Sequence, residues 1–487
     1  MRLVVLVAVL SGVVACTTPN ASRRTAEVAN APAARGEPAL QGKFDALRAA
    51  GYSGAAVVTR NGRRVFGEAA GEAAPGVPFT TATAVDVASI AKPITGMAVA
   101  KLMDQGKLSL DDTLGRWFPD APADKRSITV RQLLSHSAGV VDIPEGLTDY
   151  TPINRESMLG KLLAAPLDFP PGTKSSYSNG GYQLLAFIVE NASGREFFEF
   201  LEAEIFRAAQ VVASYDPTRF PENEVARGRG RHQGWIDVRS QGDPAKGPFW
   251  GLWGAGGIFI STEDMARLMD AYLAGRIVSP EAVRLAVTPV IRAGDYASET
   301  AGWTILHSRR GTPIISYTGG SGHSQASLRH YPEAGVTIAT AGNTVAPGAI
   351  RVSRELAEPL IGPDFDPVTP APLPGTPVQP GSREEALVHA LLGAVTGGPA
   401  QRAGFLNEGA APGLRAQRTD VQWAERFDSW AAAFPNPVTR AIHRDGDTLL
   451  VVVDRLEGER PSPLRIELSL VEAGGRLLVD RIAVRRA

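Results

Sequence analysis

A proline-rich stretch divides the chain and limits what either side of it can fold into. Between residues 363 and 382, prolines recur every few positions and no apolar period survives, which is typical of an extended linker. The segment before this stretch is long enough for a large domain, and the segment after it suits a small one. We therefore predict a main domain at 41–362 and an accessory α+β domain at 383–487.

The first residues indicate an export signal rather than part of the fold. An apolar run follows Met1 and ends at Ala15 and Cys16; it is too short to span a bilayer but has the length of a secretory signal. A small residue before a cysteine resembles the bacterial lipobox, in which the cysteine is lipidated. We expect a signal peptide at 1–15, a lipid anchor at Cys16 and a flexible tether at 16–40. The protein would then be a cell-envelope lipoprotein facing the periplasm, attached to the outer membrane.

Charge and cysteine content exclude several classes of protein. Lys+Arg is 50 and Asp+Glu is 51, so the net charge of −1 provides no positive field for a nucleic-acid backbone. Cys16 is the only cysteine, so neither an intramolecular disulfide nor a cysteine-based metal site can form. We expect no nucleic-acid partner, no metal and no cofactor. For Cys16, the alternative to lipidation is a buried free thiol.

The main domain shows the pattern of an α+β fold. A β-branched apolar run at 54–60 is followed by Asn61-Gly62, a pair that favours a tight hairpin. Helical periods follow at 94–102 and after Asn179. Strand-like runs return later, at 257–261, 312–316 and 335–340. Strands at both ends with helices between them predict one sheet that joins the two ends of the domain.

The accessory domain has its own alternation of elements. Residues 384–392 and 421–434 have helical patterns, and 437–486 reads as strands with glycine-containing turns. Three aromatic residues recur at helical spacing, Trp423, Phe427 and Trp430, and are expected to cover the apolar strands. No catalytic constellation is evident in this part of the chain.

One short motif suggests chemistry. The chain lacks Gly-x-Ser-x-Gly, Walker A, His-Glu-x-x-His and Gly-x-Gly-x-x-Gly, but it contains Ser89-Ile-Ala-Lys92. At a helix start this spacing places the lysine amine beside the serine hydroxyl on one face, where an unprotonated lysine can act as a general base. The partial positive charge of the helix N-terminus would favour the alkoxide and the oxyanion. Pro93, just inside the expected helix, fits this position.

Two further segments support the motif. Tyr177-Ser178-Asn179 presents a phenol and an amide where a loop enters a helical pattern. The segment Tyr317-Thr318-Gly319-Gly320 follows a strand-like run, and its glycines allow a substrate to approach the backbone.

In this order and spacing, the motifs resemble the serine β-lactamase-like superfamily, in the branch of class C β-lactamases, D,D-peptidases and esterases. The resemblance covers residues 44–362 and rests on six segments, 86–95, 106–112, 133–139, 177–179, 255–264 and 317–319. It implies an antiparallel sheet flanked by helices, together with an all-helical region. It also implies roles: Ser89 as acylated nucleophile, Lys92 and Tyr177 sharing the acid and base work, and Asn179 orienting Lys92 and substrate. Backbone N–H groups of Ser89 and Gly320 would form the oxyanion hole, and Tyr317, Thr318 and Gly319 would border the substrate.

One departure from the family pattern concerns the third motif. It usually begins with Lys or His, whereas here it begins with Tyr317, and no lysine occurs after Lys246. A neutral phenol offers a carboxylate only a hydrogen bond. We therefore expect a serine hydrolase acting on small ester or amide substrates rather than a β-lactamase or D-alanyl-D-alanine carboxypeptidase, which stay as alternatives. A catalytically silent envelope binding protein on the same fold is the third reading.

Other side chains near these motifs have two readings each. Phe249, Trp250 and Trp253 would form either an apolar wall of the cleft or part of the core. His323 would either hold a substrate carboxylate or be a solvated loop residue, and His136 is expected to be buried with a partner. The arginines between 227 and 231 are interpreted as a solvated loop or strand edge.

Overall fold

The computed structural model describes most of the chain after residue 37. The described ranges are 38–148, 151–230, 234–236, 250–293, 297–308, 310–321, 323–344, 347–362, 375–433, 437–457 and 460–486. The predicted signal peptide, Cys16, most of the tether, and Phe249 lie outside these ranges. Within them, no helix has both the length and the apolar character needed to cross a membrane.

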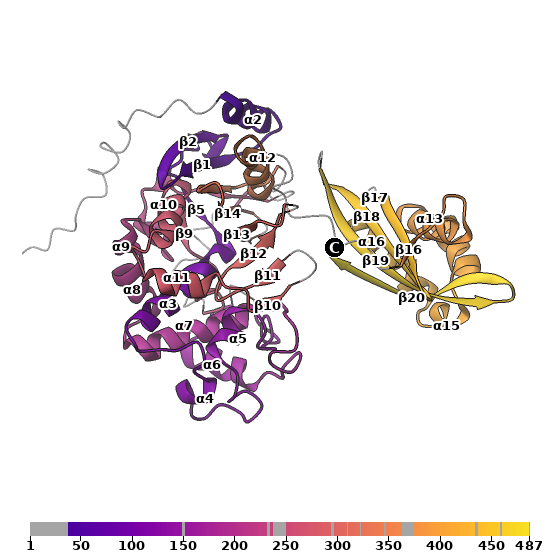
Figure 1. Ribbon diagram of the computed structural model, residues 1–487, viewed down its shortest axis with the longest axis horizontal. Helices are drawn as coiled ribbons and strands as arrows, with labels where there is room; N and C mark the ends of the chain where they lie inside the picture. The colour runs from indigo at the N-terminus through magenta and orange to yellow at the C-terminus, as the bar shows by residue number, and fades with distance from the viewer. Residues whose placement is uncertain are drawn as a thin grey trace, which may run out of the picture.

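The main unit is built on an eight-stranded antiparallel sheet (Figure 1). Its strands, in spatial order, are β10 (Ile291–Arg292), β11 (Ala297–Glu299), β12 (Thr304–His307), β13 (Pro313–Gly320), β14 (Gln325–Tyr331), β15 (Val336–Gly342), β1 (Gly54–Arg60) and β2 (Arg63–Ala70). The predicted hairpin is present, since β1 and β2 are joined by Asn61 (φ 50°) and Gly62 (φ 75°). β1 also pairs with β15, from Gly54 opposite Gly342 onward, so the sheet joins both ends of the unit, as expected.

Helices cover both faces of this sheet. On one face, α2 (Pro38–Ala49) and α12 (Ala349–Ile361) pack against each other and against apolar residues such as Val58 of β1. On the other face lies α10 (Thr262–Leu273), in the same core cluster as Val57. Both faces of β1 are buried, which explains its unbroken apolar run. Helix α2 begins inside the predicted tether, and Leu40 is fully buried.

The remaining helices of the main unit form a helical region that begins beside α10 and extends to the opposite end of the unit from α2 and α12 (Figure 1). They are α3 (Ala91–Asp104), α4 (Leu114–Trp117), α5 (Val130–Leu134), α6 (Arg155–Ala164), α7 (Asn179–Ser193), α8 (Phe197–Phe200), η2 (Leu201–Phe206), α9 (Arg207–Ala209) and α11 (Pro280–Ala286). The short helices η3 (Pro217–Arg219) and η4 (Glu222–Glu224) follow them. Helix α3 packs directly on α7.

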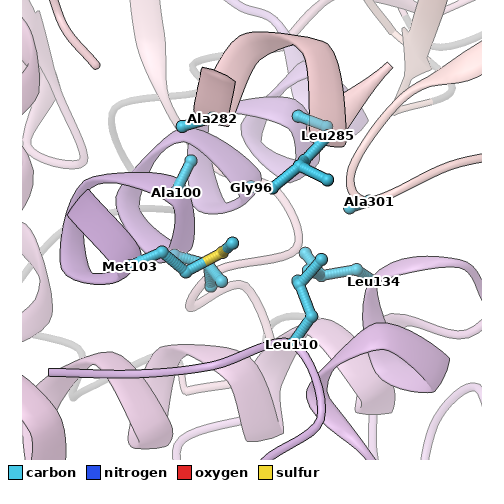
Figure 2. A pocket seen from close by; sticks show the side chains of 10 residues that line it. Gly96, Ala100, Met103, Leu110, Leu134, Ala282, Leu285 and Ala301 are labelled. Atoms are coloured by element: carbon cyan, nitrogen blue, oxygen red, sulfur yellow. The ribbon is translucent and has the colours of Figure 1, made fainter. Parts of the chain in front are cut away.

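This helical region is closely packed. A Cβ atom on Gly96 of α3 would lie 3.1 Å from the Cα atom of Gly302, so glycine allows the two backbones to approach. Figure 2 shows a gap in this region, where apolar side chains including Met103, Leu134 and Leu285 surround a void of about 10 Å³. A void of this size holds at most about one water molecule. It is therefore a packing defect rather than a ligand site.

Three small sheets complete the main unit. The first has the order β5 (Ala84–Asp86), β9 (Phe259–Ser261) and β6 (Ala213–Ser214). The others are the pairs β3 (Glu72–Ala74) with β4 (Val77–Pro78), and β7 (Gly228–Gly230) with β8 (Gly234–Ile236). Strand β5 ends three residues before Ser89, so the first of these sheets places the start of the Ser-x-x-Lys motif.

The C-terminal unit has its own five-stranded antiparallel sheet. Its strands are β16 (Thr376–Pro377), β17 (Pro437–Asp445), β18 (Thr448–Glu457), β19 (Arg460–Ala473) and β20 (Arg476–Arg486). Its helices are α13 (Arg383–Thr396), α14 (Pro399–Gly404), η7 (Phe405–Gly409), α15 (Pro412–Arg415) and α16 (Asp420–Ala433). Trp423, Phe427 and Trp430 share one core cluster with strand residues such as Val451, as expected. The linker prediction extended too far, because β16 already belongs to this sheet.

Candidate active site

Ser89 lies in a cleft at the junction of the large sheet and the helical region. It occupies a 3-10 turn, η1 (Ala88–Ile90), between β5 and the start of α3. The cleft has a volume of about 300 Å³, enough for a small organic substrate. It is lined by Asp86, Ala88, Ser89, Tyr177, Asn179, Gly251, Leu252, Ala255, Gly256, Gly257, Gly320 and Ser321.

Lys92 lies one helical turn from Ser89 and is completely buried. Its Nζ atom is 3.2 Å from the Ser89 Oγ, 2.6 Å from the Asn179 Oδ1 and 2.8 Å from the carbonyl oxygen of Ala255. Three acceptors match the three protons of an ammonium group. The predicted contacts of Lys92 with Ser89 and Asn179 are therefore both present, and the contact with Ala255 is additional.

Tyr177 approaches Ser89 from the loop that precedes α7. Its hydroxyl is 2.6 Å from the Ser89 Oγ, its ring centroid is 4.6 Å from the Lys92 Nζ, and the side chain is 48% exposed. Ser178 caps the helix by accepting a hydrogen bond from the Gly181 N–H at 2.9 Å. This cap fixes the point where Tyr177 leaves the loop and where Asn179 begins the helix.

His136 is hydrogen-bonded to the loop that carries Tyr177. Its Nδ1 accepts a hydrogen bond from the Ser178 N–H at 3.2 Å, so its proton is on Nε2, which lies 3.1 Å from the Tyr317 hydroxyl. Burial, followed by the charge of Lys92, lowers the pKa of His136 to about 3. The imidazole is therefore neutral at physiological pH and has a partner on each nitrogen, in line with the expected packing role.

Tyr317 is placed differently from the prediction. Its side chain is 6% exposed, its hydroxyl meets His136, and it is absent from the residues that line the cleft. Burial raises the pKa of Tyr317 well above its usual range. The predicted hydrogen bond from this phenol to a substrate is thus replaced by a contact inside the protein. The sequence could not reveal this, because the side chain's direction depends on the neighbouring helical region.

The rest of the third motif lies closer to the nucleophile. A Cβ atom on Gly319 would be 2.1 Å from the Val87 carbonyl oxygen and 2.9 Å from the Ser89 nitrogen, so only glycine permits this approach. Gly320 lines the cleft, as does Ser89, the other residue expected to contribute an oxyanion-hole N–H. Thr318 and Gly319 are not among the lining residues, and their substrate-binding roles stay predictions.

Comparison with known proteins identifies the main unit. The sequence profile of the family described as Beta-lactamase matches residues 40–361. The chain belongs to the beta-lactamase family. With Ser89, Lys92 and Tyr177 in contact, this membership marks the main unit as a serine hydrolase of that type.

Relatives of this beta-lactamase family member are named for different properties. It is 27% identical over 273 residues to penicillin-binding protein 4* of Bacillus subtilis, which covers 52% of this chain and 59% of that protein. It is 30% identical over 208 residues to esterase EstB of Burkholderia gladioli, covering 37% of this chain and 53% of the esterase.

A solved structure extends the likeness beyond the main unit. The structure of SurE aligns with a TM-score of 0.62 at 21% identity and covers 92% of this chain and 98% of its own. At this identity the likeness concerns the fold alone. It supports a β-lactamase/transpeptidase-like fold, as predicted.

The aromatic cluster before the cleft serves the core of this family member. Trp250 stacks on Phe187 with ring centroids 4.8 Å apart, and Trp253 stacks on Tyr215 at 4.5 Å. Neither tryptophan lines the cleft, whereas Leu252, between them, does. The apolar-wall reading of the two tryptophans is therefore wrong, and the core reading is correct for them.

His323 and the arginine segment can also be placed. His323 is 5% exposed and packs against Gly228, so the prediction of a solvated loop residue is wrong. Burial lowers the pKa of His323, which favours the neutral imidazole. Arg227 makes an ion pair with Glu222 at 3.4 Å, in keeping with an exposed strand edge.

The sequence analysis includes the segment around Ala255 in the family resemblance but predicts no contact for the Ala255 carbonyl, which meets Lys92 in the structure. The Thr95 Oγ1 donates to the Gly254 carbonyl at 2.7 Å, and the Gln183 side chain donates to the Gly251 carbonyl at 2.6 Å. These contacts attach the segment to α3 and α7. Gly254 (φ 76°) and Gly257 (φ 78°) provide its turns.

In the described residues, no group of three or more His, Cys, Asp or Glu side chains is arranged to hold a metal ion. The candidate site is built of hydroxyl, amine, phenol and amide groups.

Proposed function

We propose that the protein cleaves small esters or amides through a covalent acyl-enzyme on Ser89. The observation that carries the proposal is the set of contacts of the Ser89 hydroxyl, 2.6 Å from Tyr177 and 3.2 Å from Lys92, on the wall of a cleft of about 300 Å³. A nucleophile, a proton acceptor and space for a substrate occur together, as acyl transfer requires.

The contacts suggest how Lys92 and Tyr177 divide the work. An ammonium that donates to three acceptors has no lone pair with which to take a proton from Ser89. Its positive charge near the Tyr177 ring favours the phenolate. Tyr177 then accepts the Ser89 proton as the bond from Oγ to the acyl carbon forms, and it returns the proton to the leaving alcohol or amine. Water then attacks the acyl carbon and gives a proton to Tyr177. The bond to the Ser89 Oγ breaks, the Oγ takes the proton back, and the acid is released.

The backbone supports the charge that develops on the substrate oxygen. N–H groups of Ser89 and Gly320, both residues of the cleft wall, are the proposed donors. Loss of one such donor typically costs ~10²–10³ in rate. The short helix η1 leads into α3, whose N-terminal end adds a favourable partial charge.

The proposed substrates are neutral rather than carboxylated. Asp86 is the one charged side chain among the described residues that line the cleft, and Tyr317 points away from it into a contact with His136. A charge-assisted contact to a carboxylate is worth ~1.5–3 kcal/mol, or one to two decades in kcat/KM. We expect kcat/KM to be higher for p-nitrophenyl butyrate than for nitrocefin. A nitrocefin value at or above the ester value would favour the β-lactamase or D-alanyl-D-alanine carboxypeptidase reading.

The decisive experiment is covalent labelling. The purified protein is incubated with a fluorophosphonate probe and its intact mass is measured, in wild type and in Ser89→Ala. We expect one adduct in the wild type and none in the variant. An unlabelled wild type that also fails to turn over p-nitrophenyl acetate would favour the silent binding protein, whereas a labelled variant would show that Ser89 is not the nucleophile.

The cellular location is a separate part of the proposal. We propose that Cys16 carries a lipid that holds the protein on the periplasmic side of the outer membrane, on the strength of the apolar run and the small residue before it. Membrane fractionation of wild type and Cys16→Ser tests it. Equal membrane association of the two forms would contradict the anchor.

A further inference from the structure

The residue before Ser89 has an unusual backbone conformation. Ala88 has φ +46°, in the left-handed region that L-residues with a Cβ atom disfavour. Four described residues other than glycine share a positive φ, namely Asn61, Ala88, His136 and Gln210. Asn61 lies in a hairpin turn and Gln210 caps a helix, where such angles are common. Ala88 and His136 both lie at the candidate active site, where backbone strain is often kept for function.

The Asp86 carboxylate is hydrogen-bonded to the backbone of Ala88, the residue with the positive φ. Its Oδ1 accepts a hydrogen bond from the Ala88 N–H at 2.9 Å, a local side-chain contact two residues along the chain. Asp86 is itself held, since its carbonyl oxygen accepts from the Ser324 Oγ at 2.8 Å. The Asp86 side chain is 8% exposed, and the His323 Nε2 atom lies 4.0 Å from its other oxygen. A buried carboxylate with these contacts has little freedom to move.

The surrounding backbone leaves the turn no room to relax. Val87 donates its N–H to the Ile258 carbonyl at 3.0 Å, and its own carbonyl lies where a Cβ atom on Gly319 would be. The turn is therefore held between Ile258, which directly precedes β9, and Gly319 of β13. A change of φ at Ala88 would rotate the Ser89 N–H and Oγ together, away from Tyr177 and Lys92.

We propose that Asp86 is a positioning residue, which acts through the Ala88 N–H to hold Ser89 and its backbone N–H in the reactive orientation. This inference rests on the proposed function. It adds a residue that does not touch the reacting atoms but sets where two of them lie. A displacement of about 1 Å in such a group reduces rates by about 10²-fold.

A double-mutant cycle separates this role from general stabilisation. The variants are Asp86→Ala, Ala88→Gly and their combination, with Asp86→Asn as the conservative form. Glycine adopts a positive φ without strain, so the anchor should matter less when residue 88 is glycine. The readouts are the rate of Ser89 labelling by the fluorophosphonate, kcat and KM on p-nitrophenyl butyrate, and the melting temperature.

We expect Asp86→Ala to slow labelling by about 10²-fold and to lower kcat rather than raise KM. Asp86→Asn, whose amide oxygen can still accept from Ala88, should lose less than about fivefold. In the Ala88→Gly background, the same Asp86→Ala change should cost at least about tenfold less than it does beside Ala88.

Three outcomes would overturn the inference while leaving the proposed function intact. Equal losses from Asp86→Ala in both backgrounds would mean that it does not act through Ala88. A change in KM alone would mean that Asp86 contacts the substrate, and a lower melting temperature with an unchanged labelling rate would mean a structural role only. If Asp86→Ala does not fold, the labelling rate of Asp86→Asn is compared with that of wild type, and the rate of the double variant with that of Ala88→Gly. These two comparisons then test the inference. An unlabelled wild type would refute the proposed function itself.

Discussion

The two units of the chain bury different kinds of side chain. Around Ser89 the main unit encloses Lys92, His136 and further polar groups, several of them with no exposed surface. In the described part of the C-terminal unit, no Ser, Thr, Asn, Gln, His or charged side chain is buried to this degree, and the core is built of residues such as Val451. Burying polar groups is unfavourable unless they are paired. The main unit thus places paired polar groups in its core at the candidate site, whereas the described core of the C-terminal unit is apolar.

The largest effect that tests this contrast is the loss of the buried amine. Lys92→Met should slow Ser89 labelling by about 10²–10⁴-fold, because the charge that favours the Tyr177 phenolate is lost. The melting temperature should fall only modestly, since removal of a desolvated charge offsets part of the cost of leaving the Asn179 and Ala255 oxygens without their donor.

A matched control comes from a second buried lysine in the same unit. Lys125 is 2% exposed and pairs with Asp124 at 2.9 Å, away from the cleft wall. Lys125→Met should leave the labelling rate unchanged. If both variants slow labelling equally, burial of a cation rather than its position at Ser89 explains the result.

Substitution of His136 should have an intermediate effect, on the pH dependence of the free energy of unfolding and on the labelling rate. Its pKa of about 3 in the folded protein lies below the unfolded value of ~6.5, so the unfolded chain binds more protons between these values. This group therefore contributes stability above pH 6.5 that is lost as the pH falls toward 3. In His136→Asn, whose side chain tolerates the positive φ, the free energy of unfolding should fall less steeply with acidification.

The measurement is urea unfolding of both proteins between pH 7 and pH 4. Glu299, whose pKa burial raises to about 7, has the opposite sign above pH 4.5, but it is present in both proteins and cancels. Labelling of the variant at pH 7 should slow by about tenfold or less, the value of one lost hydrogen bond. Parallel pH curves for the two proteins would contradict the assigned pKa shift.

The smallest effect on chemistry is expected from the other unit. Phe427 is fully buried and packs edge to face on Trp430 and Phe405. Phe427→Ala should cost ~3–5 kcal/mol of the C-terminal unit's stability through the cavity it leaves. Below the melting transition, the rate of Ser89 labelling should stay within about twofold of wild type. A large decrease would show that the apolar unit influences the cleft and would weaken the contrast.

The sequence predicted side chains that carry a distinctive spacing, and it missed contacts that have none. Ser89 and Lys92 come together because their spacing places them on one face of a helix start, and Tyr177 and Asn179 join them as the family resemblance implies. The Ala255 carbonyl was not predictable, since any residue has a carbonyl and only the fold decides which one meets Lys92.

Backbone strain and side-chain direction were the other limits. No propensity predicts a positive φ at an alanine, so the turn at Ala88 and the contact with Asp86 appear only in the structure. The phenol of Tyr317 was assigned to the substrate from its place in a motif, yet its direction is set by His136, far away in the sequence. The burial of the aromatic residues of α16 was predictable, because an apolar helix face and an apolar sheet face are both buried when they pack against each other.

The pairing of β1 with β15 affects when the large sheet can form during synthesis. Gly54 bonds with a strand that ends at Gly342, so during synthesis the β1–β2 hairpin leaves the ribosome long before its neighbour exists. Until then β1 has an open edge and two apolar faces, a combination that favours aggregation. Contacts this distant in sequence also make folding slow.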